Sequence, residues 1–119
     1  MIFPCTWCEY ASIVIAEVLR RRGLGDWTFI TAGNPDGPNG HAWLELRESG
    51  GARLLTIDAT IDQFPWGNGS PFVSEDQTPA AAKFTRPRYE GPWERWPVLQ
   101  RDHTFRTYAE DFAALSGLA

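Results

Sequence analysis

Two strand-like runs that lie close together restrict the fold of this chain more than any other feature. HAWLELR (residues 41–47) and ARLLTIDAT (52–60) are rich in apolar and β-branched residues, and only ESGG separates them. A short glycine-containing connection between two such runs is typical of an antiparallel β-hairpin. The sequence therefore predicts an antiparallel sheet that contains residues 41–47 and 52–58.

A helix is predicted before this hairpin, over residues 7–22. Thr6 and Glu9 have the spacing of a capping box, with Thr6 as the N-cap and Cys5 just outside the helix. Gly23 is placed to end it. The apolar residues expected to face the core at helical spacing are Ala11, Val14, Ile15 and Val18.

The remaining segments are predicted from their composition. WTFIT (27–31) is typical of a short strand, and AGNPDGPNG (32–40) of a loop. Residues 65–103 are rich in proline and tryptophan, and we expect them to wrap the core as ordered coil with short strands around 84–89. A C-terminal amphipathic helix is expected over 104–116. Its apolar stripe consists of Phe105, Tyr108, Phe112 and Leu115.

At 119 residues the chain is long enough for one hydrophobic core. We expect a single α+β domain over residues 1–119, with its core in residues 5–64. The net charge of −4 gives a nucleic-acid-binding surface little support. No apolar run reaches the roughly 20 residues of a membrane span, and no secretory signal is visible at the start. We therefore expect a cytoplasmic protein that binds neither nucleic acid nor membrane, and the sequence indicates no oligomeric state.

Cys8 is the first candidate for chemistry. In the predicted helix it is the second residue, where unpaired backbone N–H groups and the positive end of the helix dipole favour a thiolate. The negative charge of the neighbouring Glu9 opposes this effect. A cysteine is also a common buried side chain without a chemical role, so its placement alone leaves both interpretations open.

His41 and Asp58 are the second candidate, because the register of the hairpin decides whether they meet. If ESGG forms a four-residue loop, His41 lies directly opposite Asp58; a two-residue turn at Gly50 and Gly51 makes them diagonal neighbours on one face. A three- or five-residue loop sends them to opposite faces. An ordinary cross-strand ion pair would use the same positions as a catalytic pair.

Together, Cys8, His41 and Asp58 have the parts of a Cys-His-Asp catalytic triad. His41 would accept the proton of the thiol, and Asp58 would hold the imidazole in the required tautomer and orientation. A thiol nucleophile with such a base predicts acyl transfer through an acyl-enzyme intermediate.

Three motifs in this order, CEYAS, GHAWLEL and IDAT, resemble the transglutaminase-like branch of the papain-like cysteine enzymes. Proteins of that group carry a cysteine at the start of a core helix, then an H-x-W strand and a D-x-T strand. The resemblance covers residues 5–64. It implies a papain-like, transglutaminase-like fold and a thiol-dependent enzyme that acts on a polypeptide or other amide, as peptidase, amidase, deamidase or transamidase.

The resemblance also implies that Cys8, His41 and Asp58 occupy the catalytic positions, with no cofactor and no metal. Members of the group usually stabilise the oxyanion with a side chain well upstream of the nucleophile, and seven residues precede Cys8. We therefore expect the Cys8 backbone N–H to act with Gln63 or a neighbouring backbone donor. Trp43, on the predicted His41 face, is a candidate wall of the substrate cleft.

Three other interpretations use the same residues. Cys5-x-x-Cys8 has the spacing of thioredoxin-type redox sites, but the four preceding residues do not supply the strand that fold needs. A zinc site would need further ligands from His41, Asp58 or His103, whose spacing matches no common zinc site. The third interpretation is a module that binds a peptide on the same scaffold without catalysis.

Overall fold

The computed structural model describes residues 5–37, 39–60 and 71–100, together with four helical positions, Thr107, Glu110, Asp111 and Ala114. In chain order the elements, with η for a 3-10 helix, are α1 (Cys5–Arg21), β1 (Thr28–Gly33), β2 (Gly40–Arg47), β3 (Arg53–Asp58), β4 (Phe72–Ser74), η2 (Pro79–Ala82), β5 (Arg86–Gly91), η3 (Trp93–Arg95) and η4 (Pro97–Gln100).

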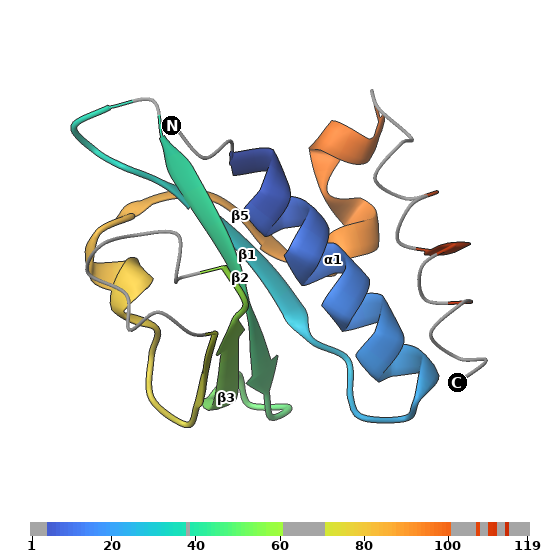
Figure 1. The fold of residues 1–119 in the computed structure, drawn as a ribbon. Helices are drawn as coiled ribbons and strands as arrows, with labels where there is room; N and C mark the ends of the chain where they lie inside the picture. The colour runs from blue at the N-terminus through green and yellow to red at the C-terminus, as the bar shows by residue number, and fades with distance from the viewer. Residues whose placement is uncertain are drawn as a thin grey trace.

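The five strands form one antiparallel sheet in the order β4-β3-β2-β1-β5. α1 lies along one face of this sheet and contacts mainly β2 (Figure 1). We call this face the helix face and the opposite one the far face. A helix packed on an antiparallel sheet confirms the predicted α+β class, and the pairing of β2 with β3 confirms the predicted hairpin.

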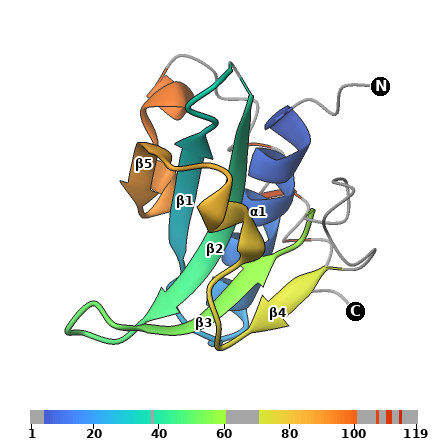
Figure 2. The same cartoon turned by 90° about the vertical axis from the view of Figure 1, so that its left-hand side faces the viewer.

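The connection between β4 and β5, which contains η2, covers part of the far face. Figure 2 shows η2 in front of β2 with α1 behind it, and Figure 1 shows the two on opposite sides of the sheet. The buried residues of the far-face core are Ile30, Ala32, Trp43, Ala80 and Phe84. Because both faces are covered, β2 has buried side chains that point in both directions.

α1 begins two residues earlier than predicted. Thr6 is its second residue and not the N-cap, and Cys5 is helical instead of preceding the helix. The prediction is wrong because an S/T-x-x-E spacing also occurs inside helices, so it fixes a helix start only to within about a turn. Cys8 is therefore the fourth helical residue, at the end of the first turn, where the influence of the dipole is already falling.

The deepest face of α1 also differs from the predicted stripe. Its buried residues are Cys8, Ser12, Ile13, Ala16 and Glu17. Val14 and Ile15 are partly buried and pack against the same helix-face core. Trp93 and Trp96, from the region of η3, belong to this core too, and Figure 1 shows that region beside α1. The helix is thus covered from two directions, which buries a wider arc than one apolar stripe.

Two predicted segments have shifted limits. β1 continues to Gly33 and β2 begins at Gly40, so the predicted loop 32–40 is shorter than expected. A hydrogen bond from the Asn34 N–H to the Asn39 carbonyl oxygen (2.8 Å) closes it. The short strand expected around 84–89 is β5, which pairs with β1 at the edge of the sheet.

The predicted C-terminal helix, residues 104–116, lies mostly outside the described residues. The four described positions within it are helical and exposed, as the prediction requires at those positions. Its predicted apolar stripe lies outside the described residues. Within the described part of the chain, we find no helix with the length and apolar character needed to cross a membrane.

Candidate functional site

The hairpin of β2 and β3 places His41 and Asp58 on the far face of the sheet as diagonal neighbours. Leu44 pairs with Ile57, and this register puts Asp58 across from Trp43 rather than from His41. Since residues two apart on a strand share a face, His41 and Trp43 point the same way as Asp58. The arrangement is the diagonal one that was predicted for a two-residue turn.

A β-bulge produces this register although the turn is longer. Residues 49–51 form a three-residue turn, closed by a hydrogen bond from the Glu48 N–H to the Ala52 carbonyl oxygen (3.0 Å). Regular pairing from such a turn would send the histidine and the aspartate to opposite faces. Leu54 is an extra residue on β3, between two residues that pair with consecutive positions of β2. This one added residue brings both side chains back to the same face.

His41 and Asp58 form a buried imidazole–carboxylate pair. The Nε2 atom of His41 lies 2.8 Å from Oδ1 and 3.0 Å from Oδ2 of Asp58, and both side chains are 0% exposed. Because a carboxylate only accepts, Nε2 carries the proton, and the neutral ring then has its lone pair on Nδ1. Nδ1 is also buried. The pair therefore presents Nδ1 as the basic atom of the imidazole.

Two residues that the sequence did not single out complete this cluster. The hydroxyl of Thr78 donates to Oδ2 of Asp58 at 2.7 Å, and the ring of Phe84 stacks on the imidazole at 5.4 Å between centroids. Both come from the connection that covers the far face. Thr78 followed by Pro79 is a helix-start signal that could have located η2. No local pattern could have predicted the contact with Asp58, since the two residues are 20 positions apart.

A second buried carboxylate, Glu45, lies on the same face and is part of an ion-pair network. It accepts hydrogen bonds from the indole of Trp43 (3.2 Å), the guanidinium of Arg47 (2.8 Å) and the amide of Gln77 (3.1 Å). Arg47 also donates to Glu90 at 2.6 Å, and this hydrogen bond holds the pKa of Glu90 below its usual value. Glu45 with its three partners, and Glu90 through Arg47, thus connects β2, β5 and the covering connection.

Trp43 lies beside the imidazole and lines a shallow groove. Its ring centroid is 6.1 Å from that of His41, and its side chain is 3% exposed. The groove has a volume of about 550 Å³ and is bounded by Trp43, Phe84 and residues of β1 and β5, with a mostly apolar lining. Trp43 and Phe84, the two aromatic side chains beside the imidazole, thus also line this groove.

Cys8 is placed by the first turn of α1. It is a thiol, 1% exposed, in the helix-face core together with Ala42 and Leu44. The imidazole of His41 lies on the far face. Figures 1 and 2 both show α1 and β2 beginning at the same end of the molecule. The structure thus brings His41 and Asp58 together, and Cys8, in the first turn of α1, belongs to the core cluster that also contains Ala42, the residue after His41 on β2.

Gln63, the predicted oxyanion donor, lies outside the described residues, as does His103. In the described ranges, no group of three or more His, Cys, Asp or Glu side chains is placed to hold a metal ion.

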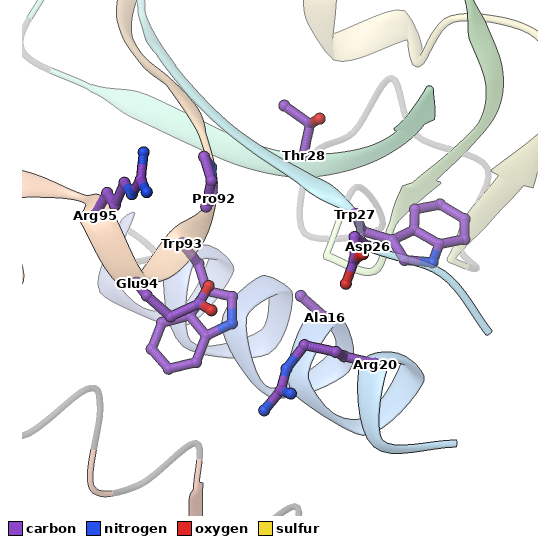
Figure 3. A pocket seen from close by; sticks show the side chains of 9 residues that line it. All are labelled: Ala16, Arg20, Asp26, Trp27, Thr28, Pro92, Trp93, Glu94 and Arg95. Carbon is purple, nitrogen blue, oxygen red and sulfur yellow. The ribbon is translucent and has the colours of Figure 1, made fainter. Parts of the chain in front are cut away.

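A separate pocket of about 450 Å³ lies toward the other end of α1, between this helix and η3 (Figure 3). Its lining consists of Ala16, Arg20, Asp26, Trp27, Thr28, Pro92, Trp93, Glu94 and Arg95. Two of its charged side chains are acidic and two are basic, so the lining favours neither an anion nor a cation. None of the predicted site residues lines this pocket, and the His41–Asp58 cluster remains the candidate site.

The chain matches no protein-family model, and neither a curated protein nor a solved structure is significantly similar to it.

Proposed function

We propose that this protein is a thiol-dependent acyl-transfer enzyme that acts on an amide through Cys8, His41 and Asp58. The observation that supports this most strongly is the hydrogen bonding of His41 Nε2 to the Asp58 carboxylate. These are the two residues that the sequence assigns to base and orienting group. A buried carboxylate is costly unless it is paired, and here its partner is an imidazole, the side chain that enzymes use most often as a general base.

The proposed mechanism follows from the hydrogen bonding of His41: Nε2 is bonded to Asp58, so Nδ1 is the nitrogen that acts as the base. Nδ1 of His41 accepts the proton of the Cys8 thiol, and the thiolate attacks the carbonyl carbon of the amide. Asp58 stabilises the imidazolium that forms at this stage. The imidazolium returns the proton to the amide nitrogen, the C–N bond breaks and the amine leaves, and the acyl group remains on Cys8 as a thioester. Water or a second amine, deprotonated by Nδ1, then attacks the thioester and restores the thiol.

The order of elements is consistent with the transglutaminase-like fold expected from the motifs. The helix with Cys8 comes first, and the strands with His41 and Asp58 follow as neighbours in one antiparallel sheet. The proposed substrate is a polypeptide or another amide, and the apolar groove beside Trp43 is the proposed place where it lies.

A second candidate function, a peptide-binding module without catalysis, has one observation in its favour. Cys8 packs in the helix-face core, whereas the imidazole of His41 lies on the far face. In this alternative, the His41–Asp58 pair only holds the hairpin and the covering connection together. Cys8 would then be an inert buried thiol.

Alkylation of the thiol separates the two candidates. Iodoacetamide is added at neutral pH, and the rate of labelling of the Cys8 peptide is followed by mass spectrometry. The enzyme proposal predicts that labelling slows at least about tenfold in His41→Ala, because the thiolate loses its base. Cys5→Ser serves as the control and should label at the wild-type rate. Equally slow labelling of wild type and His41→Ala, with fast labelling after denaturation, would support the binding module.

A further inference from the structure

We propose that Thr78 is a positioning residue, whose hydroxyl fixes the carboxylate of Asp58 and thereby the tautomer of His41. The catalytic consequence rests on the function proposed above, but the effect on the tautomer does not. Thr78 is 2% exposed, and Asp58 and His41 are 0% exposed, so no bulk water competes for these hydrogen bonds.

The direction of the Thr78 hydroxyl is set by its two partners. The Ala80 N–H donates to Oγ1 at 3.2 Å, which uses a lone pair of this oxygen. The only proton on Oγ1 then points to Oδ2 of Asp58, 2.7 Å away. Hydrogen bonds to a carboxylate are stronger than those between neutral groups, and this one has the usual length for a hydroxyl donor.

Thr78 is itself held in place by the turn that it begins. It is the N-cap of η2, with Pro79 as the first helical residue. Ala80, two residues on, is completely buried in the far-face core. The hydroxyl is therefore attached to a short rigid turn that is anchored to the sheet.

The hydrogen bond from Thr78 to Asp58 matters because the carboxylate group of Asp58 could otherwise rotate about its terminal torsion. The terminal torsion of an aspartate is broad and nearly two-fold, so one histidine partner does not fix both oxygens. With Thr78 on Oδ2, the plane of the carboxylate is set, and both oxygens face Nε2 of His41. This geometry favours the tautomer with the proton on Nε2 and leaves the lone pair on Nδ1.

Nitrogen-15 NMR of the imidazole measures the tautomer directly. The chain has two histidines, so His103→Gln serves as the background in which the remaining signals belong to His41. Spectra at alkaline pH, where imidazoles are neutral, give the ratio of the two tautomers. In Thr78→Val, which keeps the shape and removes the hydroxyl, we expect the ratio of Nε2–H to Nδ1–H to fall about tenfold. Thr78→Ser, which keeps the hydroxyl, should restore the wild-type ratio.

Gln77→Ala is the matched control. It removes the bonds from Gln77 to Glu45 and to the Thr78 N–H, and leaves the Asp58 contact in place. The proposal is overturned if folded Thr78→Val keeps the wild-type tautomer ratio, or if Gln77→Ala changes the ratio as much.

A measurement on the unmodified protein remains decisive if Thr78→Val does not fold. The hydroxyl proton of Thr78 should exchange slowly with water, in contrast to that of the exposed Thr85. Equal exchange at both residues contradicts the proposal. Iodoacetamide labelling of Cys8 tests catalysis separately: a tautomer shift in Thr78→Val with no effect of His41→Ala on labelling would retain the positioning role and remove the enzyme.

Discussion

Nε2 of His41 lies 2.8 Å from Oδ1 of Asp58, although the two residues are diagonal and not opposite on their strands. Their side chains meet because one extra residue in β3 compensates for a three-residue turn. The pairing thus depends on the backbone of the hairpin as well as on the two side chains.

The carboxylate of Asp58 should matter more for chemistry than for stability. In Asp58→Asn one of the two donors, Nε2 or the Thr78 hydroxyl, would face an NH₂ group, so the His41 ring is expected to change tautomer. We expect acyl transfer to slow by about 10²–10⁴-fold and the free energy of unfolding to fall by about 1–3 kcal/mol. Kinetics with an activated ester and urea denaturation measure the two effects.

Glu45→Gln is the control for this variant. It removes a buried carboxylate from the same face, but Glu45 does not bond to His41 in the described structure. It should lower stability and leave the rate of acyl transfer near that of wild type. A similar loss of rate in both variants would mean that the far face supports the fold only.

The turn between β2 and β3 depends on Gly51. Its φ is +92°, a region that side chains other than glycine adopt at a cost, whereas Gly50 has no positive φ. Gly51→Ala should therefore lower the free energy of unfolding by about 1 kcal/mol or more, and Gly50→Ala should change it little. Thermal or urea denaturation of the two variants checks this, and equal stability would show that the turn has another conformation.

Glu17 should make the protein less stable in acid. Burial alone raises the pKa of Glu17, but the hydrogen bonds from Arg20 and Arg21 outweigh it and leave the pKa below its ordinary value of 4.5. A carboxyl whose pKa is lower in the folded state stabilises the fold above the unfolded pKa, and this contribution disappears as the pH falls below about 4.5.

Glu17→Gln should therefore flatten the acid side of the stability curve, measured by urea denaturation at several pH values. At neutral pH it should cost about 1–2 kcal/mol, toward the lower end because both guanidinium groups are partly exposed. Glu75→Gln, at an exposed position, is the control and should leave the curve unchanged. If the two variants give the same curve, the arginine contacts do not stabilise Glu17.

The parts of the fold that could be predicted are those with a local periodic pattern. α1 has apolar residues at helical spacing, and β2 and β3 are apolar runs around a glycine turn. A short strand was expected around residues 84–89, but the proline and charges of β5 (RPRYEG) do not indicate its partner; its place at the edge comes from pairing with β1. β4 (FVS) was not predicted, because three residues are too few to show a periodic pattern.

The candidate site likewise has a part that the sequence could predict and a part that it could not. The sequence could place His41 and Asp58 on paired strands, but their register depends on the bulge at Leu54, which has no signature in the sequence. The contact of Thr78 with Asp58 depends on how the covering connection folds back over the sheet. Contacts between residues that are far apart in the sequence depend on how the chain packs, and no local sequence pattern predicts them.

Trapping of the acyl group tests the central claim most directly. The protein is incubated with p-nitrophenyl acetate, quenched in acid and digested, and the acetylated residue is identified by mass spectrometry. We predict a single acetyl group on Cys8, formed at the wild-type rate in Cys5→Ser and strongly slowed in His41→Ala. Acetylation of other residues only, or an equal rate on Cys8 with and without His41, would contradict the proposal that Cys8, His41 and Asp58 act together.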